Sequence, residues 1–419
     1  MVKQLKSVIS QSFIKIGKIP ILKGALSLSV GSLIAKALGI AFSLILARVF
    51  IPKDYGVVQY SITIGMIISA GTQSFGQHVI ARFIGKYKYD ITQMSIMFSN
   101  ACFVLLLIGI ITIIIATPVL LILKKFNIGV IVIFLGLTAF YSYWGLSSGL
   151  QKSTKINIAY IGSNLVQLLS VAGLIYVLGM KSTLLATIIY GASYFIPLAL
   201  LFFLSPFELD LTYKHVQQKY VVDIIKFYCP IFISHSCYVL SGSLSIIFLE
   251  HYFSNTEVGV FAVAKTIAMV FLFIPSGITT LLMPRAASLS KNESYQTLRK
   301  LLIFSGFVNL VILLCLIVFI KWFITSMFGT EYLIGTEIYV IQALGTILFG
   351  IHSIITAVLV GTGYPIYETN SRILVVLVSL IAMWLLIPKY GALGAAITTL
   401  LGSLAALLSY IMVFKIRKL

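Results

Sequence analysis

Charged residues are scarce in this chain of 419 residues, because Asp, Glu, Lys and Arg together make up only 10% of it. Soluble domains carry about a quarter of their residues as charges and use them to build a polar surface. Hydrophobic residues instead reach 60%, and the mean hydropathy is +1.08. The composition excludes an ordinary soluble protein and indicates an integral membrane protein.

The sequence motifs of several enzyme classes are missing as well. No G-x-x-x-x-G-K-S/T phosphate loop, no H-E-x-x-H pair and no Ser/His/Asp pattern occurs. The four cysteines form no C-x-x-C pair and fall in apolar stretches, which is typical of small buried hydrophobic side chains. We therefore expect no enzyme activity, no bound metal and no cofactor.

Acidic residues are few, with 11 Asp and Glu against 30 Lys and Arg and a net charge of +19. In a soluble protein this excess would favour nucleic-acid binding. Here the basic residues sit singly between apolar stretches, where such residues orient membrane helices. We therefore expect most of these residues to orient helices in the lipid bilayer, and we expect no nucleic-acid partner.

Twelve apolar stretches are long enough, or nearly so, to cross a bilayer as helices of about 20 residues. Barrel strands are unlikely, because they alternate in polarity and are about ten residues long. The sequence therefore predicts an all-α integral membrane protein with 12 transmembrane helices. The stretches are 24–47, 56–80, 94–122, 127–149, 156–179, 182–204, 224–249, 258–283, 301–325, 336–360, 371–388 and 391–414.

The basic residues between these stretches indicate the orientation. One side collects 21 Lys and Arg, the other collects 7, and 2 lie inside predicted spans. Because cytoplasmic loops are enriched in Lys and Arg, both termini are predicted to be cytoplasmic.

A weak internal repeat relates the two halves of the chain. When 44–88 is aligned with 247–291, nine of 45 positions are identical, and Gly56 meets Gly259. Two such copies would form two six-helix bundles related by a pseudo-two-fold along the membrane normal, with substrate between them. The predicted division is a basic cytoplasmic or interfacial segment 1–23, a bundle 24–204, a cytoplasmic linker 205–223, a bundle 224–414 and a cytoplasmic tail 415–419.

Two lysines lie inside predicted spans. Lys36 is near the centre of the first span, where a charge costs a few kcal/mol, and Lys265 is about a third of the way into the eighth. Each fits a cation facing a water-filled lumen, and each could alternatively reach the interface with its long side chain. Few acids lie inside the spans, so such a lumen would suit a phosphate or pyrophosphate.

Four further residues are candidates for substrate binding, each with a structural alternative. Arg48 ends the first span and could be a ligand or an interface anchor. Arg82 and Arg285 are repeat-related and could guard an inner mouth or simply anchor helices at the cytoplasmic side. His235 lies among serines of the seventh span, which could bind sugar hydroxyls or hold helices together.

Several motifs resemble those of polysaccharide-export flippases. The run ARVFIPKDYG at 47–56 is similar to the opening of O-antigen and capsule repeat-unit translocases in the multidrug/oligosaccharidyl-lipid/polysaccharide superfamily. The runs VGVF at 258–261, FIPSGI at 273–278 and MPR at 283–285 resemble the eighth helix and following loop of the same family.

The resemblance implies two six-helix bundles in a V shape that work by alternating access. It also implies an undecaprenyl-pyrophosphate-linked oligosaccharide as cargo, the bacterial inner membrane as location, and a glycan polymerase and chain-length regulator as partners. Lys36 and Lys265 match helices that carry important cations in related lipid flippases. A multidrug exporter of the same superfamily and a membrane glycan polymerase are the alternatives.

Overall fold

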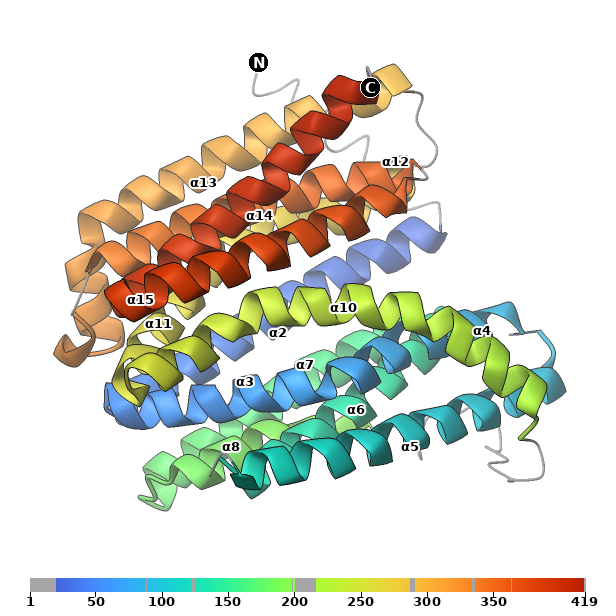
Figure 1. Cartoon of the computed structure of the whole chain (residues 1–419), viewed down its shortest axis with the longest axis horizontal. Helices are drawn as coiled ribbons and strands as arrows, with labels where there is room; N and C mark the ends of the chain where they lie inside the picture. Colours follow the sequence, from blue (N-terminus) through green and yellow to red (C-terminus); the bar gives the residue numbers. More distant parts are fainter. Residues whose placement is uncertain are drawn as a thin grey trace.

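A computed structural model describes residues 20–87, 89–122, 125–197, 199, 216–286, 291–333, 336–362 and 364–417. In these ranges every regular element is a helix (Figure 1). Nine of the described helices are long and apolar enough to cross a bilayer, and Thr183–Ser193 is a shorter apolar helix. In hydrocarbon a helix satisfies its own backbone hydrogen bonds, which explains why the apolar stretches fold in this way. The predicted all-helical membrane protein is therefore confirmed.

The elements of the first part of the chain are α2 (Pro20–Val49), α3 (Pro52–Ser74), η1 (Phe75–Ile80), α4 (Ala81–Lys86), α5 (Ile91–Ile122), α6 (Ile128–Gly149), α7 (Ser153–Ala172), η2 (Gly173–Val177) and α8 (Thr183–Ser193). Those of the second part are α10 (Gln218–Tyr252), α11 (Asn255–Ala268), η4 (Met269–Leu272), α12 (Phe273–Ala286), α13 (Lys291–Met327), η5 (Thr330–Tyr332), α14 (Thr336–Gly361) and α15 (Pro365–Arg417).

Several predicted boundaries move in the structure. The seventh span begins at Gln218 rather than 224, because its polar first turns continue the helix. Most of the predicted linker 205–223 and of the segment 1–23 lies outside the described residues. The total of twelve spans stays a prediction, since part of 182–204 is not described and α15 joins two predicted stretches.

The helices run roughly parallel to the long axis of the molecule (Figure 1). Helices α5, α6 and α8 lie in the lower part of that view, and α13, α14 and α15 lie in the upper part. Between them run α2, which packs on α7 and α12, and α10, which packs on α3 and α15. The start of α2 and the end of α15 lie at the same end of the molecule.

Glycines allow helix backbones to approach closely inside the bundle. A Cβ on Gly145 of α6 would lie 1.9 Å from the carbonyl oxygen of Gly76 in η1. A Cβ on Gly136 of the same helix would lie 2.1 Å from the carbonyl oxygen of Gly191 in α8. In a bilayer, where apolar contact with lipid competes with apolar contact between helices, close packing through small residues is a main source of association.

The repeat-related glycines meet at one helix crossing. A Cβ on Gly56 of α3 would lie 1.7 Å from the carbonyl oxygen of Asn255 in α11. A Cβ on Gly259 of α11 would lie 2.0 Å from the carbonyl oxygen of Pro52. The two positions that the alignment pairs are thus in contact, on elements from the two parts of the chain.

Helix α15 is broken at Gly391, where φ is 55° and ψ is −132°. This left-handed conformation favours glycine because it lacks a Cβ. The backbone N–H of Ala392 donates to the Glu257 carboxylate over 2.9 Å, which holds the break against α11. At 53 residues the element is far longer than a bilayer is thick, and its two arms run in opposite directions (Figure 1). The break coincides with the predicted boundary between the last two stretches.

Candidate functional site

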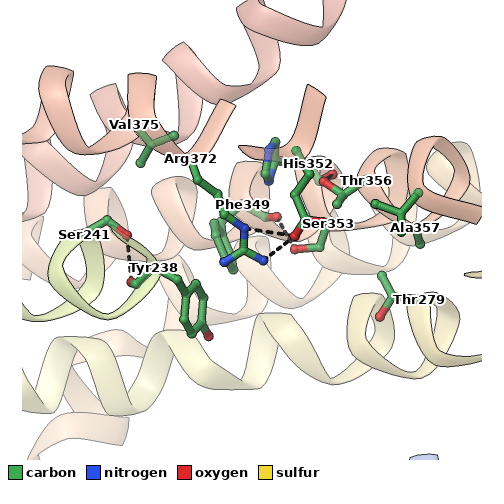
Figure 2. A pocket seen from close by; sticks show the side chains of 12 residues that line it. Tyr238, Ser241, Thr279, Phe349, His352, Ser353, Thr356, Ala357, Arg372 and Val375 are labelled. Atoms are coloured by element: carbon green, nitrogen blue, oxygen red, sulfur yellow. Dashed lines mark hydrogen bonds and ion pairs between the residues drawn. The ribbon is translucent and has the colours of Figure 1, made fainter. Parts of the chain in front are cut away.

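A cavity of about 360 Å³, with a mostly apolar surface and a few polar side chains, lies between α10, α12, α14 and α15 (Figure 2). Its walls carry the ring of Phe349 and small apolar side chains. Among its lining residues the polar ones are Tyr238, Ser241, Thr279, His352, Ser353, Thr356, Glu368 and Arg372. Polar and ionisable side chains are rare inside membrane bundles, and those present usually mark the path of a ligand or ion.

The Arg372–Glu368 ion pair is the charged feature of this cavity (Figure 2). The two residues lie one turn apart on α15, and Nε and Nη2 of Arg372 both donate to Oε1 of Glu368. The guanidinium carbon is 5.0 Å from the centre of the Tyr238 ring on α10, which is within the range of a cation–π interaction. The pair is electrically neutral and joins α15 to α10.

His352 joins the cavity lining to a hydrogen-bond network between α14 and α15. Its Nε2 is 3.1 Å from Oγ of Ser371, and its ring is stacked on Tyr410 with 4.8 Å between centres. The Tyr410 hydroxyl is 2.7 Å from Oγ1 of Thr356. His352 is only 6% exposed, and its Nδ1 has no hydrogen-bond partner among the described residues.

Two histidines from distant parts of the chain meet next to this cavity. His78 lies in η1, a π-helical segment, and its ring centre is 6.2 Å from that of His235 on α10. The His235 ring is 6.1 Å from Tyr238, and both histidines lie within the electrostatic range of Arg372. Short π-helical segments of this kind are frequent at functional sites. The structure therefore brings the predicted residue His235 to the edge of the cavity.

Lys265 also lies beside the cavity. It is half-buried on α11, and its ammonium donates to the carbonyl oxygen of Gly242 over 2.7 Å. Gly242 directly follows Ser241, which lines the cavity. The lysine thus contacts the same stretch of α10 that forms one cavity wall.

The other predicted residues lie elsewhere. Lys36 is half-buried in the middle of α2, has no hydrogen-bond or ion-pair partner among the described residues, and does not line the cavity. Exposed Arg48 donates from Nη1 to the carbonyl oxygen of Thr325 over 3.2 Å. Exposed Arg82 lies 4.0 Å above the Phe227 ring of α10. Arg285 lies in α12, and its side chain is outside the described part of the structure.

An aromatic cluster in the first part of the chain lies within electrostatic range of the cavity residue Tyr238. It joins α6, α7 and α8 through ring contacts between 5.3 and 6.5 Å. Tyr141 and Tyr160 are close enough to Tyr238 to interact with it electrostatically. We call this the tyrosine cluster, with members Phe140, Tyr141, Trp144, Tyr160, Tyr190 and Tyr194.

The position of the tyrosine cluster can be tested with Trp144 as a reporter. The other two tryptophans, Trp322 and Trp384, are 67% and 66% exposed, as expected for lipid-facing rings. In a variant with both replaced by phenylalanine, we expect aqueous acrylamide to quench the fluorescence of Trp144 strongly and brominated lipid to quench it little. A variant that retains only Trp384 is the control and should show the reverse. Strong quenching of Trp144 by brominated lipid would contradict a water-accessible cluster.

Sequence reasoning missed the pair Glu368–Arg372, although its spacing of four residues is visible in the sequence and is typical of an ion pair on a helix. The aromatic spacing of Tyr141 and Trp144 is a second signal of this kind. No local pattern reports the partners of His352, because Ser371 and Tyr410 come close to it only when α14 and α15 pack.

The long apolar helices enclose a cavity that is lined by ionisable side chains. This arrangement is typical of a multi-pass membrane protein of the transport type. The chain belongs to the family described as polysaccharide biosynthesis protein, whose sequence profile it matches over residues 21–290. The predicted family of polysaccharide export proteins is confirmed at the level of this polysaccharide biosynthesis family.

Among curated proteins, the chain is similar to the capsular polysaccharide biosynthesis protein CapF of Staphylococcus aureus, with 26% identity over 255 residues. This alignment covers 56% of the chain and 64% of CapF. The uncharacterized membrane protein MJ1375 of Methanocaldococcus jannaschii is 20% identical over 63% of the chain and 65% of that protein. The chain thus matches slightly less than two thirds of the length of these relatives.

Solved structures share the fold over nearly the whole chain. The lipid II flippase MurJ in an inward closed conformation aligns with a TM-score of 0.76 and 17% identity, covering 93% of this chain and 87% of that one. An inward-facing multidrug resistance MATE family transporter of the MOP superfamily aligns with a TM-score of 0.70 and 15% identity, covering 93% and 97%. At these identities the likeness establishes the fold.

Proposed function

We propose that this chain translocates an undecaprenyl-pyrophosphate-linked oligosaccharide from the cytoplasmic to the outer face of a bacterial inner membrane, for O-antigen, capsule or another surface glycan. The observation that supports this proposal most directly is the cavity, which holds the Arg372–Glu368 pair inside the membrane bundle with Lys265 beside it. Hydrocarbon disfavours such groups unless they line a wet passage or pair with each other, so their gathering in one place supports a route for polar cargo. Membership of the polysaccharide biosynthesis family supports a saccharide as that cargo.

We also propose the topology that this function requires. Twelve helices form two six-helix halves, 24–204 and 224–414, joined by the linker 205–223 and related by a pseudo-two-fold. The contact of Gly56 with Gly259 supports such a relation, since equivalent residues meet where they lie on a two-fold axis. The shared end of the molecule for the start of α2 and the end of α15 supports two termini on the same side of the membrane, and the excess of Lys and Arg favours the cytoplasmic side.

Alternating access between the two halves would expose the cavity to each side in turn. The hydrogen bond from Tyr332 to the Phe50 carbonyl and the ion pair of Lys125 with Glu250 join the two parts of the chain where α2 and α10 end. We propose that these contacts close the outer end in the present state and open during transport. Lys36, Arg48, Arg82 and Arg285 stay candidates for guiding the pyrophosphate along this route.

A multidrug exporter is the second candidate, favoured by the fold shared with MATE transporters. A drug exporter should protect cells from cationic compounds, and its loss should leave surface glycans intact. A glycan polymerase, the remaining alternative, should elongate chains in a purified system. The proposed polymerase and chain-length regulator partners would act after translocation.

Neutral replacement of the two lysines tests the route. We expect Lys36→Ala and Lys265→Ala each to lower surface glycan export by roughly tenfold, because a cation inside the membrane is retained where it binds a charged ligand. Lys53, which is exposed in the first turn of α3, supplies the control variant Lys53→Ala with unchanged export. Membrane levels of folded protein should match in all three. Normal export in both lysine variants would remove these residues from the route.

The function itself is tested by deleting the gene and locating the lipid-linked repeat units. We expect them to accumulate on the cytoplasmic face, where they stay inaccessible to externally added lectin or glycosidase until the membrane is opened. Purified protein in vesicles should restore the transfer of labelled lipid-linked oligosaccharide to the opposite leaflet. Normal surface glycan in the deletion strain would refute the proposal.

A further inference from the structure

We infer that the cavity between α10, α12, α14 and α15 binds an uncharged saccharide unit of the cargo, and that the phosphates bind outside it. This inference rests on the function proposed above and divides the cargo between two places. It follows from three properties of the cavity: its net charge, the direction of its hydrogen bonds and its aromatic surface.

The charge of the cavity does not suit a phosphate. Arg372 is its cation among the described lining residues, and it is already neutralised by Glu368. Both bonds from the guanidinium go to Oε1, so Oε2 of this cavity-lining carboxylate keeps its acceptor capacity and its share of the negative charge. A pyrophosphate would be repelled by this negative oxygen at close range, and the cation that could offset the repulsion is already paired. An uncharged ligand avoids this repulsion.

The hydroxyl groups of the lining are oriented as hydrogen-bond acceptors. Each of four hydroxyls donates its proton to a backbone carbonyl of its own helix at 2.9 or 3.0 Å, namely Ser241 to Tyr238, Thr279 to Ser276, Ser353 to Phe349 and Thr356 to His352. The lone pairs of Ser241, Thr279 and Ser353 remain available to a ligand that donates, whereas Thr356 already accepts from the Tyr410 hydroxyl. Sugar hydroxyls and acetamido N–H groups donate, whereas an ionised phosphate only accepts.

Donors in the lining come from the remaining N–H groups of Arg372, from the hydroxyl of Tyr238 and, depending on its tautomer, from the unpartnered Nδ1 of buried His352. A saccharide uses both kinds of partner, because each hydroxyl donates once and accepts as well. The lining, which offers both acceptors and donors, matches this mixed demand.

Aromatic rings supply the apolar contact that a sugar ring requires. Phe349 and Tyr238 both line the cavity, and the Tyr238 ring is 48% exposed. Small-ligand sites commonly combine apolar and aromatic walls with a few placed polar groups, at volumes from about 300 Å³ upward. A cavity of about 360 Å³ therefore has room for a small part of an oligosaccharide, with the rest extending towards the tyrosine cluster.

Cysteine protection separates a sugar subsite from a phosphate subsite. In a full-length variant with the four native cysteines replaced by alanine, Ser241→Cys places a thiol in the cavity wall. The probes are N,N′-diacetylchitobiose as an uncharged sugar and inorganic pyrophosphate at equal concentration and ionic strength. We expect the disaccharide to slow labelling by a water-soluble maleimide several-fold and pyrophosphate to leave it unchanged. Ser326→Cys, exposed near the end of α13, is the control that neither probe should protect.

Each other result overturns the inference. Protection by pyrophosphate alone would make the cavity a phosphate subsite, and protection by neither probe, or no labelling at all, would exclude a water-accessible sugar site. The same variant is assayed for vesicle translocation of lipid-linked oligosaccharide. Translocation without sugar protection would refute the subsite and leave the proposed function intact, whereas sugar protection without glycan export in any assay would refute the function and leave the site.

Discussion

Replacing Gly56 or Gly259 with alanine is expected to cause a large loss of stability, although each change adds a single methyl group. The new Cβ would lie 1.7 Å from the Asn255 carbonyl oxygen in the first variant and 2.0 Å from that of Pro52 in the second. Both obstacles are backbone atoms, which cannot rotate away as a side chain can. The helices α3 and α11 must therefore separate by more than about 1 Å, in an interior that is close-packed. Overpacking of this kind typically costs about 1–3 kcal/mol and occasionally more.

The measurement is thermal unfolding of the purified protein in detergent, together with glycan export in cells. Gly306→Ala supplies the matched control, because a Cβ there would meet nothing within 4 Å on the exposed helix α13. Alanine is favoured over glycine inside a helix by about 1 kcal/mol, so this variant should unfold at the same or a higher temperature. Equal melting of Gly56→Ala, Gly259→Ala and Gly306→Ala would show that the helix crossing does not depend on the glycine pair.

The same crossing indicates how much of the fold is readable from the sequence. The long apolar stretches are sufficient to predict helices, because hydrocarbon leaves the backbone no other way to pair its polar groups. The offset of 203 residues pairs Gly56 with Gly259 on sequence alone, and the predicted boundary between the last two stretches falls at the break at Gly391. Helix ends are less readable, as the early start of α10 at Gln218 shows, since polar residues can continue a helix beyond the bilayer.

The candidate site is readable only where one residue is unusual by itself. Lys265 and His235 are predicted because an ionisable group inside a span is rare, and both lie beside the cavity. Arg372 does not stand out, since it falls near the end of a span like the other positive residues that orient helices. The position of His78 depends on the π-helical segment η1, which rotates the residues after it relative to a regular α-helix. No simple pattern in the sequence predicts such a segment.

Truncation of Arg372 is expected to have the largest effect on transport of any single change in the cavity. Arg372→Ala removes both hydrogen bonds to Glu368 and the guanidinium over Tyr238, and it leaves a carboxylate without its partner in the bundle. Breaking a fully buried pair costs about 3–5 kcal/mol. Here the side chains keep 29% and 23% exposure, so we expect a smaller loss of stability and at least a roughly tenfold loss of glycan export. Arg372→Lys should retain part of the activity, because it keeps the charge but not the planar fork.

The double variant Arg372→Ala/Glu368→Ala separates a structural role from a role in recognition. Removing both partners eliminates the unpaired carboxylate, so the melting temperature should return most of the way to that of the parent protein. Transport should not return, because the cavity has then lost the guanidinium donors and the carboxylate acceptor together. Recovery of export along with stability would mean that the pair only fastens one arm of α15 within the bundle. Recovered stability with export still absent is the outcome that a ligand-binding cavity requires.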